Sequence, residues 1–239
     1  MLPDFQLVEA VKSGSRENVD LAISRGATLN ARDLGGNSLL RLAERCHQND
    51  IARYLIQLGA NVHVVDGRNG RTLLHLAANK ENFGFATVLV EAGLSPNVQD
   101  FRGLTPLHIA AKNSHEYFMR YLLDHGADPN RVARNGDSPL HLAARAGNIP
   151  IIQLLIRKGA QAQLNNKHRT PYQEAMKYNQ FEAADLLRHL PELSSEGNSS
   201  PSFDDSEMQK PAECAAESNG KRFSAQVRQS QEIDLSRSR

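Results

Sequence analysis

The sequence predicts an all-α solenoid of stacked helix-turn-helix units with β-hairpin-like loops between them. A seven-residue motif that begins with Thr or Ser occurs five times, and its first residues lie 34, 33, 33 and 32 positions apart. A glycine followed by a small or apolar residue recurs with the same period, at Gly26, Gly59, Gly93, Gly126 and Gly159. The composition changes after Leu190, where Ser-rich sequence begins. Since a fixed period of about 33 residues sets the whole architecture, we expect one repeat domain followed by a tail.

The motif predicts the start of the first helix in each unit. The close copies are TLLHLAA from Thr72, TPLHIAA from Thr105 and SPLHLAA from Ser138, and the weaker ones are SLLRLAE from Ser38 and TPYQEAM from Thr170. Thr or Ser provides an N-cap oxygen, and proline at the first helical position lacks only an N–H that has no partner in the helix. The paired alanines allow a neighbouring unit to approach closely.

A second apolar stripe follows in each unit and predicts a second helix. In one unit it comprises Phe118, Tyr121, Leu122 and Leu123, and Gly126 ends the helix because glycine adopts positive φ freely. Two helices alone cannot bury both stripes, so the units must stack.

These residues resemble the ankyrin repeat, whose unit combines a turn, a T-P-L-H-x-A helix start, a second helix and a closing G-A-D-x-N loop. The resemblance covers residues 4–190 and implies a recognition scaffold with six units. The expected units are 4–32, 33–65, 66–99, 100–132, 133–164 and 165–190. The first and last depart from the motif and are expected to cap the array, with Glu174 on a polar outer face where other units carry Leu or Ile.

Bulk composition excludes several classes of protein. The formal net charge is +1, so no overall attraction to nucleic acid or anionic membranes is expected. Neither a membrane-spanning run of apolar residues nor a secretory leader is visible, and the two cysteines are too far apart in sequence for a thiolate zinc motif. We expect a monomer in the cytoplasm, and also in the nucleus, without membrane contact or cofactor.

The composition of residues 191–239 predicts a disordered tail. They include eleven serines and few large apolar residues, too few to offset the entropy of ordering. Phe223, Val227, Ile233 and Leu235 leave open a short partner-binding helix, and Ser224 follows a Lys-Arg pair that is typical of a kinase site.

Three histidines recur at the same place in the motif: His75, His108 and His141. Equivalent positions of packed units lie about 8–10 Å apart, too far to share one metal ion. The resemblance implies that these side chains make hydrogen bonds that hold each helix start. No nucleophile–base pair or phosphate-binding glycine loop is evident, so no catalytic residue and no metal site is predicted.

Two asparagines fit a modification pattern of the family. Asn130 follows Leu122 and Asp128 at the spacing typical of hydroxylated ankyrin asparagines, and Asn97 is a looser match. A structural role in the loop is the alternative.

The resemblance implies a partner-binding concave face made by the turn tips and the ends of the first helices. Eleven of the twenty-five positions expected there are basic, whereas Asp137 is the single acid among them. The predicted basic residues are Arg45, Arg68, Arg71, Lys80, Arg102, Lys112, Arg134, Arg145, Lys167, Arg169 and Lys177. Phe101, Leu104 and Tyr178 are predicted apolar anchors, and we expect Arg102, Arg134 and Arg145 to pair with carboxylates of a partner. The simpler alternative is that these cations only solvate the surface.

The leading functional hypothesis is a non-enzymatic adaptor or regulator that binds an acidic or phosphorylated protein. Two alternatives stay open, a nucleic-acid-associated protein and a bacterial effector directed at host proteins. Nucleic acid ranks behind protein as the expected partner, because base-stacking platforms and base-reading motifs are missing from the sequence.

Overall fold

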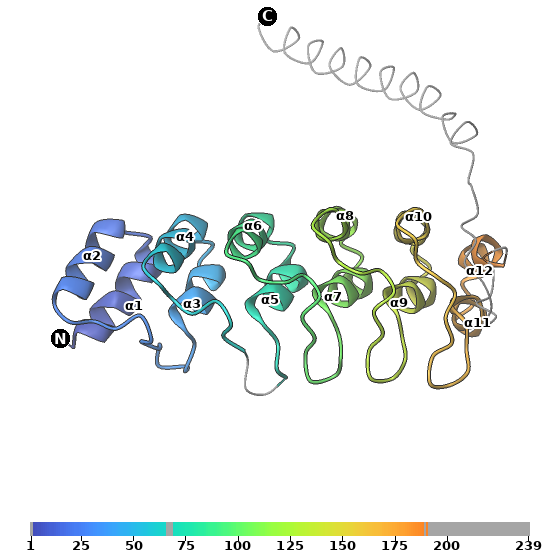
Figure 1. Ribbon diagram of the computed structural model, residues 1–239, viewed down its shortest axis with the longest axis horizontal. Helices are drawn as coiled ribbons and strands as arrows, with labels where there is room; N and C mark the ends of the chain where they lie inside the picture. The colour runs from blue at the N-terminus through green and yellow to red at the C-terminus, as the bar shows by residue number, and fades with distance from the viewer. Residues whose placement is uncertain (1, 66–68, 189, 191–239) are drawn as a thin grey trace, which may run out of the picture. The chain divides into compact units, whose positions relative to one another are not determined.

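The computed structural model describes residues 2–65, 69–188 and 190. These residues form twelve helices arranged as six consecutive pairs (Figure 1). The predicted all-α solenoid is confirmed. The tail 191–239, including Ser224 and the four apolar residues of its end, lies outside the described residues.

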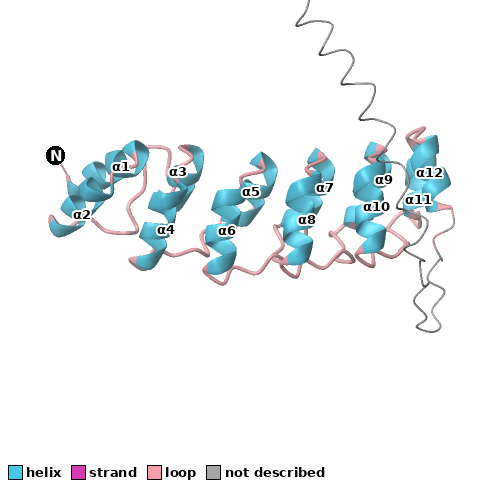
Figure 2. Ribbon diagram, turned by 90° about the horizontal axis from the view of Figure 1, so that it is seen from above, coloured by secondary structure: helices cyan, strands magenta, loops and turns pink. Residues whose placement is uncertain are grey.

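The helices alternate between two rows. The first helices of the pairs are α1 (Pro3–Ser13), α3 (Leu39–Arg45), α5 (Leu73–Lys80), α7 (Pro106–Asn113), α9 (Pro139–Ala146) and α11 (Pro171–Lys177). The second helices are α2 (Arg16–Ser24), α4 (Asn49–Gln57), α6 (Phe83–Glu91), α8 (Glu116–Asp124), α10 (Ile149–Arg157) and α12 (Phe181–Leu187). Figure 2 shows successive pairs side by side.

The motif starts a first helix wherever it occurs. Thr72, Thr105, Ser138 and Thr170 are N-caps of capping boxes, in which the N-cap side chain and the side chain three residues later satisfy each other's backbone N–H groups. Ser38, at the weaker copy, accepts a hydrogen bond from the backbone of Arg41. Local hydrogen bonding therefore sets where each pair begins.

Stacking buries the small residues of the first helices and the large ones of the second. Ala77, Ala110 and Ala143 are fully buried, as are the rings of Phe85 and Phe118. Successive first helices contact each other along the array; for example, α7 contacts both α5 and α9. The alanines allow this close approach, so the core continues from pair to pair.

Tight loops join each pair to the next at one edge of the array, and we call them fingers. They comprise residues 31–38, 64–72, 98–105, 131–138 and 163–170, of which 66–68 are not described. Neighbouring fingers share backbone hydrogen bonds, for example from Arg134 N–H to the Arg102 carbonyl at 2.9 Å. Gly103 has φ +73°, and a Cβ there would lie 2.8 Å from the Arg134 nitrogen, so glycine permits this approach.

One expectation about the last pair is wrong. Glu174 is only 1 % exposed and therefore does not lie on a polar outer face. It accepts hydrogen bonds from Arg145, Arg169 and Asn165, so its charge is compensated inside the array.

Candidate binding surface

The fingers and the adjoining sides of the first helices form the face predicted to bind a partner, called here the concave face. The three motif histidines fix its geometry. His108 Nδ1 accepts a hydrogen bond from the Thr105 N–H at 3.2 Å, and its Nε2 donates to the Asp137 carbonyl of the next finger at 3.1 Å. His75 and His141 bond in the same way, with the carbonyls of Leu104 and Arg169 as acceptors.

This arrangement requires neutral imidazoles. Burial lowers the pKa of His108 to about 4, against the opposing effect of its hydrogen bond to the Asp137 carbonyl. Burial also lowers the pKa of His75 and of His141. The histidines act as struts between units, as the resemblance implied.

A groove of about 410 Å³ lies on the concave face between the third and fourth fingers. Its apolar part is formed by Phe101, Leu104, Ile109, Ala133 and Leu142. Its charged lining consists of Arg71, Arg102, Lys112, Arg134, Arg145 and Asp137.

The structure divides ten of the eleven predicted cations into two sets of five. Five are paired with acids of the array itself: Arg45 with Asp33, Arg71 with Asp100, Lys80 with Glu44, Arg145 with Asp137 and Glu174, and Arg169 with Glu174. These five are compensated internally, which corrects the expectation that Arg145 is available to a partner's carboxylate. Arg68 lies outside the described residues.

Four of the five acids that compensate them are almost completely buried. The side chains of Glu44, Asp100, Asp137 and Glu174 are at most 3 % exposed. Glu44 and Asp100 were missed because reasoning from the sequence counted only residues expected to point outward, and the ion pairs of Asp137 and Glu174 were not foreseen. An acid inside the helix motif was the available signal: Glu44 stands where three other copies have alanine.

Asp137, Arg145 and Glu174 form a charged network between the last two pairs. Arg145 lies 3.0 Å from Asp137 and 3.2 Å from Glu174, and Asn165 donates to both acids. Burial raises the pKa of Asp137 and of Glu174, but Arg145 and Asn165 outweigh it, so both pKa values end below their usual range. Burial lowers the pKa of Arg145, and the two acids more than reverse this. The network is ionised at neutral pH.

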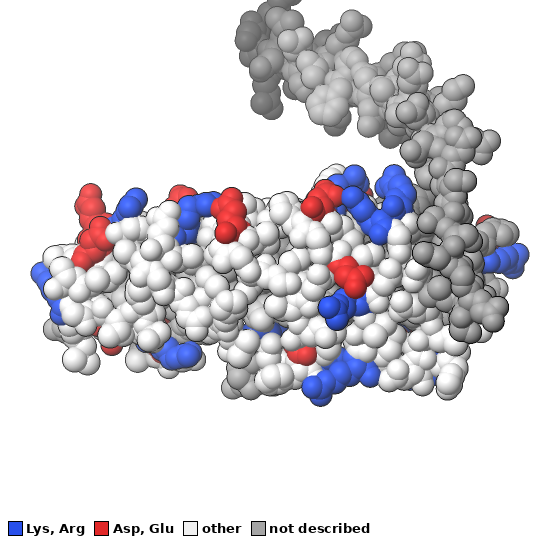
Figure 3. Space-filling view, in the orientation of Figure 1, with Lys and Arg blue, Asp and Glu red and all other residues white. Residues whose placement is uncertain are grey.

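The second set of cations has no ion-pair partner within the described part of the chain. It comprises Arg102, Lys112, Arg134, Lys167 and Lys177, all exposed. In Figure 3, blue and red groups adjoin one another along the edge formed by the second helices, whereas the finger edge shows more blue than red. The predicted cations that have no ion pair among the described residues thus belong to the last three helix pairs and the fingers that precede them.

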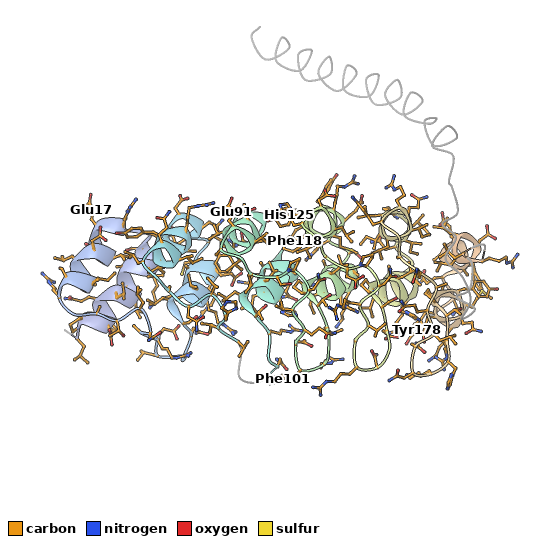
Figure 4. The ribbon with its side chains drawn as sticks, in the orientation of Figure 1. Glu17, Glu91, Phe101, Phe118, His125 and Tyr178 are labelled. Atoms are coloured by element: carbon orange, nitrogen blue, oxygen red, sulfur yellow. The ribbon has the colours of Figure 1, made fainter. Side chains whose placement is uncertain are left out.

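Three apolar side chains accompany these cations. Phe101 is 53 % exposed, lies at the finger edge (Figure 4), and packs its ring over Gly70 of the preceding finger. Leu104 is half-buried in the groove. Tyr178 is 44 % exposed in a smaller recess, with Arg145 and Lys177 over its ring at 5.4 and 5.5 Å. Phe101 and Leu104 share the groove, and Tyr178 does not.

The two asparagines predicted as hydroxylation sites make hydrogen bonds that connect units. Asn130 donates from Nδ2 to the Gly159 carbonyl at 2.9 Å, and its Oδ1 accepts from Gln161 N–H at 2.8 Å. Asn97 makes the equivalent bonds to Gly126 and Asp128. Each asparagine therefore ties one unit to the next, and hydroxylation remains a prediction.

Within residues 2–65, 69–188 and 190, no group of three or more His, Cys, Asp or Glu side chains is placed to hold a metal ion. No helix of these residues has the length and apolar character needed to cross a bilayer.

Comparison with known proteins agrees with this geometry. Family models described as ankyrin repeats match residues 58–133 and 128–196, and a single ankyrin-repeat model matches residues 35–67. This chain belongs to the ankyrin-repeat family. The first helix pair lies before the matched residues, so the matches leave the count of six units unconfirmed. Ankyrin repeats form an interaction module, and this chain carries one.

Two curated relatives are similar over part of the chain. Palmitoyltransferase Hip14 of Drosophila melanogaster is 31 % identical over 41 % of this chain, and diacylglycerol kinase iota of Mus musculus is 29 % identical over 42 %. The aligned segments cover only 16 % and 10 % of those proteins, and the similarity is confined to their repeats. The activities in their names belong to those proteins.

Proposed function

We propose that this protein is a non-enzymatic adaptor or regulator that binds an acidic or phosphorylated protein through the concave face of its last three helix pairs. The observation that carries the proposal is the separation of the cations into two sets. Arg102, Lys112 and Arg134 line one groove and have no ion pair among residues 2–65, 69–188 and 190, whereas their neighbours Arg71 and Arg145 are paired.

Charge and shape support this function together. A groove lined by charge of one sign raises the local concentration of an oppositely charged partner and speeds its association. Phe101 and Leu104 provide apolar area in the same groove, and apolar contacts contribute affinity that charge alone does not. Surface solvation explains scattered cations but not their gathering around an apolar floor.

The structure alters which residues should be tested. Reversing Arg145 would leave Asp137 and Glu174 without their shared cation, so lost binding would reflect lost structure. The informative variant is Arg102→Glu/Arg134→Glu. A single charge reversal away from the groove, Arg157→Glu, is the control, since Arg157 is exposed at the end of α10 and does not line the groove.

The experiment is affinity capture from cytoplasmic and nuclear extracts with the full chain, at low and moderate salt. The partner is a protein that the double variant no longer captures, that Arg157→Glu still captures, and whose binding is weaker at moderate salt. Recovery of the same proteins with both variants would contradict the proposal, and recovery of DNA or RNA alone would favour the nucleic-acid alternative. A cytoplasmic or nuclear location is part of the proposal and is tested by fractionating cells.

A further inference from the structure

We infer that the groove between the third and fourth fingers recognises a phosphorylated side chain followed or preceded by a large apolar residue. The inference rests on the proposed function and narrows it from acidic proteins to a phosphorylated peptide segment. Of the cations that line the groove, two guanidinium groups and one ammonium group have no ion pair among the described residues, whereas Arg71 and Arg145 are paired with acids of the array.

The two arginines begin from adjacent backbone positions. The Arg134 N–H donates to the Arg102 carbonyl at 2.9 Å, so the two residues are hydrogen-bonded neighbours on different fingers. This bond brings the backbones of the two residues into direct contact. Both side chains are exposed, and both line the groove. The two positive side chains repel each other, and an anion bound between them would relieve this repulsion.

The acids near these arginines do not provide that anion. Asp100 is fully buried, and its Oδ1 accepts hydrogen bonds from the backbone N–H groups of Arg102 and Leu104. Asp137 is 3 % exposed and is held by Arg145, Asn135 and Asn165. No acid of the described residues pairs with Arg102, Lys112 or Arg134, so these three exposed cations are open to an anionic ligand.

A phosphate monoester matches this charge better than a single carboxylate does. It carries about −1.5 to −2 at pH 7 and offers three acceptor oxygens, whereas a carboxylate carries −1 and offers two. Guanidinium groups bind phosphate with two parallel hydrogen bonds each. Lys112, at the end of α7, provides a third cation on the same groove.

The apolar floor of the groove indicates that a large apolar residue lies beside the phosphorylated one in the peptide. Phe101, Ile109 and Leu142 come from the third finger, α7 and α9, and they line the same 410 Å³ groove as the cations. Neighbouring side chains of an extended peptide are separated by about 3.3 Å along the chain and by about twice that on one face. A Leu, Ile, Met or Phe within two residues of the phosphate would reach this floor.

The test uses the purified full chain and three immobilised pools of degenerate peptides, centred on phosphoserine, on serine and on glutamate. We expect the phosphoserine pool to bind at least about tenfold more tightly than the glutamate pool, because one charge-assisted hydrogen bond has this effect. The retained phosphopeptides should be enriched in large apolar residues within two positions of the phosphate. Arg102→Glu/Arg134→Glu should lose the preference, and Arg157→Glu should keep it.

The outcomes separate this inference from the proposed function. Equal binding of the phosphoserine and glutamate pools, lost in the double variant, would overturn the phosphate assignment and leave the acidic-partner function standing. Equal binding of all three pools, or a preference unchanged by the double variant, would overturn the assignment. Tighter binding of a single-stranded oligonucleotide than of the phosphoserine pool would overturn it in favour of nucleic acid. Thermal unfolding of each variant establishes that it is folded.

Discussion

Arginines with similar sequence positions have different roles because of the acids beneath them. Arg145 and Arg134 belong to one unit and were predicted to act alike. Arg145 compensates two buried carboxylates, whereas Arg134 has no ion pair within the described residues. One residue stabilises the array, and the other is available to a ligand.

This difference predicts opposite outcomes for two alanine substitutions. Arg145→Ala should lower the free energy of unfolding by about 2 kcal/mol, because it leaves buried Asp137 without a cation and buried Glu174 with Arg169 alone, and the partial exposure of Arg145 reduces the cost. Arg134→Ala should change it by less than about 0.5 kcal/mol and weaken binding. Urea unfolding of both variants measures the difference. Equal losses of stability would show that the two arginines are not distinct.

The finger is the element that gives the concave face its geometry. Gly103 lies in the third finger and Gly93 lies just after α6; both have positive φ, but their surroundings differ. A Cβ at Gly93 meets nothing within 4 Å, whereas a Cβ at Gly103 meets the backbone of the next finger. In the last finger, His168 occupies the position equivalent to Gly103 with φ 52°.

We predict that Gly93→Ala costs about 1 kcal/mol of unfolding free energy, the cost of a left-handed alanine, and that Gly103→Ala costs clearly more. The excess arises because the added methyl group pushes against the Arg134 nitrogen. His168→Gly should be neutral or stabilising by up to about 1 kcal/mol. Thermal unfolding of the three variants tests the ranking, and a Gly103→Ala no worse than Gly93→Ala would contradict the contact between fingers.

At the scale of the whole molecule, three histidine struts make stability depend on pH. The pKa values of His75, His108 and His141 are lower in the folded protein than the ordinary value of about 6.5. The unfolded chain therefore binds more protons below that pH. The stabilisation is complete above pH 6.5 and is lost as the pH falls toward 4.

We accordingly predict that the free energy of unfolding falls steadily between pH 6.5 and pH 4, with His108 alone contributing on the order of 3 kcal/mol. The nearby charges of Asp100 and Asp137 limit the shift by favouring the imidazolium. The control is His108→Gln, because Gln173 makes the equivalent helix-start hydrogen bond in the last motif without titrating. Urea midpoints at three pH values should show a smaller pH dependence in this variant, and an unchanged dependence would contradict the strut account.

The sequence predicts the architecture well because the repeat carries its signals locally. N-cap residues, helix-start prolines and loop glycines fix the helices whatever lies around them, as Thr105, Pro106 and Gly126 do. The candidate site was predictable only in part. Phe101, Arg102 and Arg134 were placed on this face from their positions in the unit, but Arg71, Lys80 and Arg145 pair with buried acids that lie, except for Asp137, in neighbouring units. Such partners lie about 8 to 36 residues away, and a single sequence does not reveal them.

The central claim is that the uncompensated cations of one groove, rather than the basic residues of the whole concave face, are the working surface. Chemical-shift mapping of the full chain, titrated with the phosphoserine peptide pool, tests it most directly. The account predicts that shifts concentrate at Phe101, Arg102, Lys112 and Arg134, with Arg45 and Lys80 little changed. Shifts spread evenly along the fingers, or centred on Arg45 and Lys80, would contradict it.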